Sequence, residues 1–189
     1  MSFILTRFGH KFNFDTLDIN EIDINDIAWS LSNICRFNGH TKFFYSVLEH
    51  SLNVYDTLVL EYSYSNIDTQ LGVLLHDAAE CYLNDIPRPF KKELKYNNFT
   101  CEGFEEKILF EKIFKKFNIE ISFTEWELIK FVDSKIFISE IEQLFNFDWE
   151  LKKDIISYKH LIIKKSESKE WVRKEFLRLF SQLINKKNV

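Results

Sequence analysis

His76 and Asp77 adjoin each other within the apolar stretch 71–80, where we expect a helix. Burying a histidine–carboxylate pair is costly unless a partner compensates it, and a metal ion does so. His50 lies upstream and Asp133 downstream, each in its own apolar periodic segment. Two imidazoles and two carboxylates form a nitrogen and oxygen ligand set that suits Mn²⁺, Co²⁺, Fe²⁺, Ni²⁺ or Mg²⁺ and leaves Zn²⁺ open. The sequence therefore predicts one divalent metal ion per chain, with open positions for water.

Further charged residues accompany these ligands. Glu80 follows His76 by one turn of the predicted helix, and Asp85 begins a segment with two prolines that we expect to form an extended loop. Carboxylates beside a metal site can handle protons or orient water. The basic residues near these segments, each of which taken alone is more commonly a surface charge, are Arg36, Lys42, Arg88, Lys91 and Lys92. Arg36 ends a predicted helix and is our candidate for phosphate binding, because a guanidinium group can hold two phosphate oxygens.

Each ligand also has a simpler interpretation when taken alone. His50 would then be a hydrogen-bonded core histidine, and Asp133 would be a helix cap or an ion-pair partner. A His–Asp doublet such as 76–77 is by itself a common dipeptide. The metal prediction therefore depends on the combination of residues.

The elements that must position these side chains are predicted to be helical. Gly (4) and Pro (2) are scarce, which favours long helices over a turn-rich β fold. We expect a short hairpin within 1–20, followed by helices over about 25–38, 45–61, 68–83 with Asp68 as N-cap, 99–117, 122–145 and 167–185. The expected core positions of the fourth and last helices are Phe104, Ile108, Phe114, Phe117, Trp171, Phe176, Leu179 and Leu183. The result is an all-α domain of six or seven helices, and 189 residues suit one domain over 1–189.

Composition restricts the partners. The net charge of −4 argues against a general polyanion binder, and we interpret the basic segment 162–189 as a solvated helix face, so no nucleic-acid partner is expected. Three cysteines without CxxC spacing argue against a disulfide framework or a thiolate zinc site and fit a reducing cytoplasm. No signal peptide or membrane-length apolar run is visible. We therefore expect a cytoplasmic protein without a membrane partner.

Three segments carry a resemblance to a known family. The strings ICRFNGHT (34–41), YSVLEHS (45–51) and LLHDAAECYLNDIPRPFK (74–91) resemble the HD-domain phosphohydrolase superfamily. The branch that they resemble contains bacterial 5′-deoxynucleotidases and phage-encoded relatives, including a dATP triphosphohydrolase. The similarity covers about 20–95 plus Asp133, and the C-terminal third matches no motif that we can name.

The resemblance implies a single HD-type helical domain with one catalytic divalent metal, bound by His50, His76, Asp77 and Asp133. It places Glu80 and Asp85 near the attacking water and the leaving oxygen, so the expected catalytic residues are Asp77, Glu80 and Asp85. It suggests that Arg36 binds phosphate and that segment 37–40 borders the nucleotide. The expected substrate-binding residues are Arg36, His40, Lys42, Arg88 and Lys91. Relatives are often homo-oligomers, and we expect the same here.

Three functional hypotheses follow. The first is a phosphohydrolase that converts deoxynucleoside 5′-monophosphates to deoxynucleoside and phosphate. The second is a deoxynucleoside triphosphate triphosphohydrolase, which needs more positive charge around the phosphates; Lys42, Arg88, Lys91 and Lys92 could supply it. The third is a non-catalytic nucleotide-binding module, which is disfavoured because all four metal ligands and both further carboxylates are present.

Overall fold

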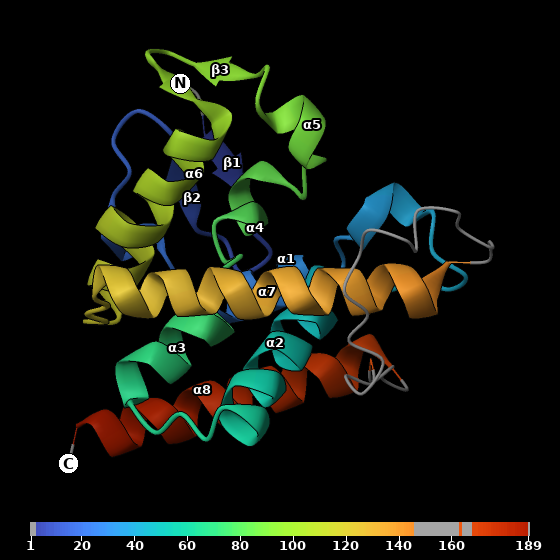
Figure 1. The fold of residues 1–189 in the computed structure, drawn as a ribbon. Helices are drawn as coiled ribbons and strands as arrows, with labels where there is room; N and C mark the ends of the chain where they lie inside the picture. The colour runs from blue at the N-terminus through green and yellow to red at the C-terminus, as the bar shows by residue number, and fades with distance from the viewer. Residues whose placement is uncertain (1–2, 146–162, 164–167, 189) are drawn as a thin grey trace.

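The computed structural model describes residues 3–145, 163 and 168–188. Within these residues the fold consists mostly of helices, with two small antiparallel hairpins, so the predicted all-α class is confirmed (Figure 1). The elements in chain order are β1 (Phe3–Leu5), β2 (Lys11–Asn13), η1 (Ile19–Glu21), α1 (Ile24–Leu31), η2 (Arg36–Gly39), α2 (Val47–Glu61), α3 (Ile67–Leu74), α4 (Glu80–Leu83), α5 (Arg88–Lys91), β3 (Lys95–Tyr96), β4 (Phe99–Thr100), α6 (Cys101–Ile108), the π-helix η3 (Leu109–Phe114), α7 (Phe123–Leu144) and α8 (Lys169–Lys187).

Helices α2 and α7 each begin at a capping motif that can be recognised in the sequence. Ser46 caps α2 and Ser122 caps α7, and in each case the side chain of a glutamate three residues later accepts a hydrogen bond from the backbone N–H of the cap residue. The bounds of α7 therefore agree closely with the predicted helix over 122–145. The prediction that Asp68 caps the next helix is wrong. Asn66 caps α3, because its side chain accepts the hydrogen bond from the backbone N–H of Thr69.

The predicted helix over 68–83 is wrong in its middle. α3 ends at Leu74, and a series of turns separates it from α4. The short helix α5 also forms within the predicted extended loop, so the described chain has eight α-helices rather than six or seven. The imidazole Nδ1 of His76 lies 2.7 Å from the carbonyl oxygen of Val73, the acceptor that a continuing α-helix would offer to the N–H of Asp77. His76 and Asp77 therefore lie in a turn between two helices. The predicted helix over 99–117 is divided as well, into α6 and the π-helix η3.

α7 crosses the middle of the molecule (Figure 1). It packs against α2 and α3 on one side, while α8 packs against α1, α2 and α3 beneath them. The predicted N-terminal hairpin is confirmed, since Ile4 pairs with Phe12 across β1 and β2. Phe12 is fully buried and its ring stacks on Tyr82 of α4, with the centroids 3.6 Å apart. The hairpin thus packs against α4.

Most predicted core positions are buried, and one is wrong. Phe104, Ile108, Phe114, Phe176 and Leu183 are buried, whereas Phe117 and Leu179 are half-buried. Trp171 is 52% exposed, because the buried face of α8 includes the next residue instead. The buried residues of α8 are Val172, Phe176, Phe180 and Leu183. Among the helices of the described chain, none has the length and apolar character required to span a bilayer.

Candidate metal centre

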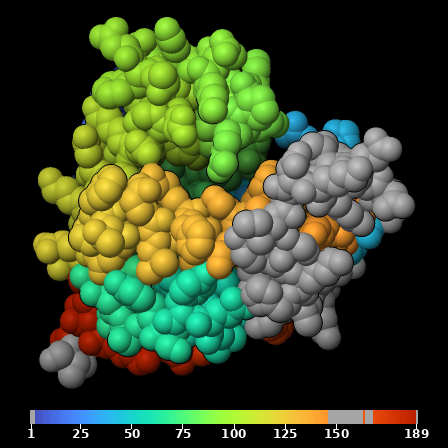
Figure 2. Space-filling view, viewed as in Figure 1, coloured from blue at the N-terminus to red at the C-terminus, as the bar shows by residue number. Residues whose placement is uncertain are grey.

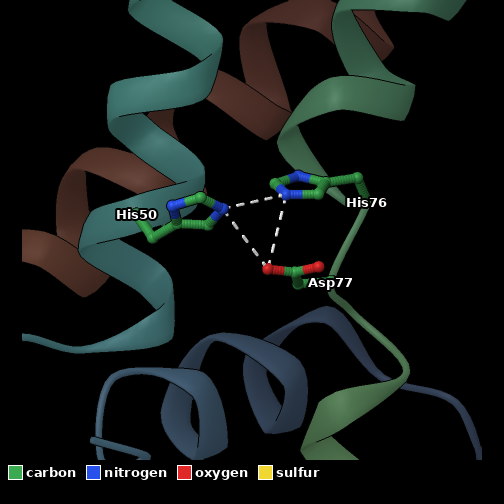
Figure 3. A group of neighbouring side chains, drawn as sticks. All are labelled: His50, His76 and Asp77. Atoms are coloured by element: carbon green, nitrogen blue, oxygen red, sulfur yellow. Dashed lines mark hydrogen bonds and ion pairs between the residues drawn. The ribbon is translucent and has the colours of Figure 1, made fainter. Parts of the chain in front are cut away.

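Three chain segments bring the predicted metal ligands together. His50 comes from α2, His76 and Asp77 from the turn after α3, and Asp133 from α7. The two Nε2 atoms are 3.2 Å apart, and Asp77 Oδ2 lies 3.3 Å from Nε2 of His76 and 3.5 Å from Nε2 of His50. Figure 3 shows these three side chains facing one another. Asp133 joins them through His50, with its Oδ1 3.0 Å from the same Nε2.

The outer nitrogens of both imidazoles fix the direction of the inner ones. Nδ1 of His50 lies 2.7 Å from Glu140 Oε1, and Nδ1 of His76 lies 2.7 Å from the carbonyl oxygen of Val73. A carboxylate and a carbonyl only accept hydrogen bonds, so each Nδ1 carries a hydrogen and each ring turns its Nε2 inward, where that nitrogen can bind a proton or a metal ion. Metal-binding histidines are commonly oriented in this way.

The spacing fits a divalent cation. Ligand atoms about 2.0–2.2 Å from a common ion in tetrahedral or octahedral geometry stand roughly 2.8–3.6 Å apart. The distances among His50, His76 and Asp77 and between His50 and Asp133 are all 3.0–3.5 Å. The donor set is mixed nitrogen and oxygen, as the sequence predicted. His50, His76 and Asp77 could therefore hold a metal ion, with Asp133 beside them.

The electrostatics of the centre also favour a positive charge. Burial and the nearby Arg36 would lower the pKa of His50, but the hydrogen bonds with Asp133 and Glu140 and the charge of Glu140 raise it to about 9. Burial would raise the pKa of Asp133, yet the hydrogen bond with His50 and the surrounding cations hold that pKa well below its usual range. The cluster thus retains carboxylate charge that a proton or a metal ion must neutralise.

Glu140 organises the centre, although the sequence analysis did not identify it. Its fully buried carboxylate is bound by Nδ1 of His50, by the hydroxyl of Tyr45 at 2.8 Å and by Nη2 of Arg36 at 3.0 Å. Arg36 and His50 lower the pKa of Glu140 against the effect of its burial. Glu140 follows Asp133 by two turns of the same helix, so a polar residue recurring on the apolar face of α7 was the signal available in the sequence.

Arg36 does not end a helix as predicted, because α1 ends five residues before it and Arg36 begins the unusual backbone segment η2. Its guanidinium is buried between Glu140 and Asp77, with Nη1 3.6 Å from Asp77 Oδ2. Burial would lower its pKa, but these carboxylates raise it, so Arg36 remains charged. Phe37 and Asn38 both have left-handed backbone conformations, with φ of 54° and 50°. Such conformations are costly for residues other than glycine and are often retained at functional sites.

A cavity of about 410 Å³ opens beside the ligands. Its lining includes His76, Asp77 and Asp133, together with Arg36, Glu80, Asp85, Arg88 and Lys91 from the predicted site. Figure 2 shows the surface hollowed between the green segment that includes α5 and the orange part of α7. Two predicted substrate-binding residues, His40 and Lys42, are not part of this lining. Both are exposed, and the ammonium of Lys42 donates to the carbonyl of Gln143 instead.

Glu80 and Lys91 form a second buried network in the cavity wall. Nζ of Lys91 lies 2.6 Å from Glu105 and 3.5 Å from Glu80 Oε1, while Glu80 Oε2 is buried with no hydrogen-bond partner in the described structure. Burial and the carboxylates of Asp77 and Asp85 raise the pKa of Glu80 well above its usual value. Burial also raises the pKa of Asp85. These two carboxyl groups therefore bind protons more readily than exposed carboxyl groups, a property that suits proton transfer. Glu105 was not identified from the sequence.

Comparison with known proteins supplies relatives but no activity. No protein-family model matches the chain. The uncharacterized protein YfdR of Escherichia coli strain K12 is 45% identical over 108 residues, which are 57% of this chain and 54% of YfdR. The uncharacterized protein RCAP_rcc00048 of Rhodobacter capsulatus is 40% identical over 73 residues, which are 38% of this chain and 37% of that protein. The chain thus spans about half the length of the first relative and just over a third of the second.

Proposed function

We propose that this chain is a metal-dependent phosphohydrolase of the HD type that acts on deoxynucleoside 5′-monophosphates. The observation that carries the proposal is the convergence of His50, His76, Asp77 and Asp133 beside a cavity whose lining includes Arg36. These residues come from three distant segments, and their inward lone pairs and carboxylates match the coordination chemistry of a divalent ion. The resemblance of the three sequence segments to HD-domain phosphohydrolases supports the same activity.

The residues around the metal ligands divide the chemical work. His50, His76 and Asp77 would hold the divalent ion, which would supply a nucleophilic water at neutral pH and offset phosphate charge. Arg36, fixed by Glu140, offers its guanidinium to phosphate oxygens at the cavity wall. Glu80, whose Oε2 has no partner in the described structure, accepts a proton from the attacking water. Asp85, with its raised pKa, donates a proton to the oxygen of the leaving deoxynucleoside.

The charge of the cavity favours a monophosphate. Carboxylates outnumber cationic side chains in the lining, seven to four: the acidic residues are Asp77, Glu80, Asp85, Glu102, Glu105, Glu106 and Asp133, and the basic residues are Arg36, Arg88, Lys91 and Lys130. The lining therefore has an excess of three negative charges, which a divalent ion would reduce to one. Each negative charge on the substrate then adds repulsion, and a triphosphate carries about twice the charge of a monophosphate. Lys91, moreover, is already paired with Glu80 and Glu105.

A triphosphohydrolase is the second candidate, favoured by one observation. Arg88 is 72% exposed at the cavity, with Nη2 3.9 Å from Asp133 Oδ2, so it could turn toward a longer phosphate tail. Its charge is the main feature that would serve a triphosphate and not a monophosphate.

Product analysis tests the proposal and separates the two candidates. The protein is reconstituted with Mn²⁺ or Co²⁺ and incubated with each deoxynucleoside mono-, di- and triphosphate, and phosphate and triphosphate are quantified separately. We expect phosphate and deoxynucleoside from the monophosphates, and none from the matched variant Asp77→Ala. Release of triphosphate would establish the second candidate. Absence of both products from metal-loaded protein would reject a phosphohydrolase.

A further inference from the structure

An aromatic wall closes the cavity on one side of the metal ligands. Phe37 and Phe137 both line the cavity, and their rings stack with centroids 5.7 Å apart and planes inclined by 28°. Phe145 packs edge-on against Phe37 at 5.2 Å, and the guanidinium carbon of Arg36 lies 5.2 Å from the centroid of the same ring. Phe37 thus contacts three side chains, and its contacts with Phe145 and Arg36 fix the ring on which Phe137 stacks.

Phe137 nevertheless remains 40% exposed. An exposed aromatic ring in the wall of a polar cavity offers an apolar, flat surface to a ligand. The backbone of Phe37 has a positive φ of 54°, so the inner ring of the wall is presented from a strained conformation. The wall is therefore a preorganised surface rather than an isolated exposed side chain.

The position of Phe137 along α7 suits the base of a nucleotide. Phe137 follows Asp133 by four residues, which places it on the same helix face about 6 Å further along the axis. A sugar separates phosphate and base in a nucleoside monophosphate by a similar length. A phosphate beside Asp133 and Arg36 would then leave its base level with Phe137.

The opposite arm of the cavity is less suited to a base. Trp126 lies seven residues before Asp133, about 10 Å along the same helix. Its ring is packed edge-on against Phe110, with centroids 4.8 Å apart, and is half-buried. Two acidic residues, Glu102 and Glu106, line this arm, so it offers charge rather than a free aromatic face.

We propose that the exposed face of Phe137 is the stacking platform for the nucleobase of the substrate. This inference rests on the proposed function and specifies how that site holds a nucleoside. Stacking uses the flat face that all bases share, so the platform accepts every base and favours purines through their larger ring area. The side-chain amide of Asn38 lies in the same lining and can meet the edge of a stacked base.

Equilibrium binding tests the inference separately from turnover. The probes are dAMP, dCMP and 2-deoxyribose 5-phosphate, which lacks a base, each titrated by calorimetry into metal-loaded protein in the presence of Ca²⁺ or at low temperature to limit hydrolysis. The variants are Phe137→Ala and Phe137→Trp. The matched control is Phe131→Ala, because Phe131 is 50% exposed on the same helix but is not part of the cavity lining.

We expect Phe137→Ala to weaken dAMP binding by about 5- to 100-fold and to leave the binding of 2-deoxyribose 5-phosphate unchanged. Phe137→Trp should bind dAMP at least as tightly as the natural protein does. The control Phe131→Ala should bind dAMP with the same affinity as the natural protein. Equal dAMP affinity in Phe137→Ala and Phe131→Ala would overturn the platform, as would equal losses for dAMP and the base-free sugar phosphate.

The outcomes also separate this inference from the proposed function. Base-dependent binding through Phe137 without hydrolysis of any deoxynucleotide would support the platform and reject the phosphohydrolase. Hydrolysis that does not depend on Phe137 would support the phosphohydrolase and reject the platform. Failure of the natural protein to bind dAMP would overturn both.

Discussion

Replacing Glu140 by Gln tests whether this buried carboxylate organises the centre. The amide keeps the shape of the side chain, and its oxygen can still accept from Tyr45 and from Nδ1 of His50. Its NH₂ group, however, then faces Nη2 of Arg36, which is also a donor. In the described structure the buried Arg36 pairs with two carboxylates, Glu140 and Asp77. The variant therefore leaves it only the longer contact of 3.6 Å to Asp77. Removing one partner of a buried ion pair costs about 3–5 kcal/mol of folding stability. Because the contact with Asp77 remains, we expect the free energy of unfolding to fall by about 3 kcal/mol.

Urea denaturation of the metal-free protein measures this loss. We expect the midpoint of Glu140→Gln to fall by about 1 M or more. Glu127→Gln is the control on the same helix, because its pair with Lys130 is half-exposed and is expected to contribute less than about 1 kcal/mol. Calorimetry should also show metal binding that is about 10- to 100-fold weaker in Glu140→Gln, through the loss of charge behind His50. Equal midpoints for the two variants, with unchanged metal affinity, would refute this reasoning.

Three further changes test other parts of the structure. Asp77→Ala should lose both the bound metal, measured by elemental analysis, and turnover; retained stoichiometric metal would contradict its assignment as a ligand. Glu80→Gln should keep the metal and lose turnover by about 10²–10⁴-fold, and full activity would exclude a role in proton transfer. His10 lies 2.6 Å from Asp26, and this hydrogen bond raises its pKa above the usual value near 6.5. The pair therefore stabilises the fold fully below about pH 6.5 and less as pH rises through the raised pKa, so the stability difference from His10→Gln should be larger at pH 5.5 than at pH 8.5; a difference that grows with pH would show the sign to be wrong.

The sequence predicted helices well where their ends depend on local chemistry. α7 begins at the Ser122 capping box, and each partner in that box lies within three residues of the other. The break between α3 and α4 could not be predicted in this way, because its apolar pattern is compatible with one helix. At the break, the carbonyl of Val73 contacts the imidazole of His76, and the periodicity of apolar residues does not reveal such a contact. The same is true of the π-helix that interrupts the predicted helix over 99–117.

The candidate site shows a similar division. The metal ligands could be selected because their residue types are rarely buried without a partner. Glu140 was harder to select, because α7 also carries Glu127 and Glu142, and its spacing of two turns from Asp133 is a weak signal among them. Its importance depends on the three donors that tertiary packing brings to it. Lys42 shows the opposite error: it was predicted to bind substrate because it is near Arg36 in the sequence, but it does not line the cavity.

The ligands of the centre are far apart along the chain, with His50 and Asp133 separated by 83 residues. An ion held between them would act as a cross-link that closes a long loop and ties α2 to α7. Its stabilisation would rise with free metal concentration, reaching about 2.7 kcal/mol at one hundred times the dissociation constant. Starvation for the metal would then lower the amount of folded protein as well as its activity. The cellular abundance of this protein would thereby follow the supply of its metal.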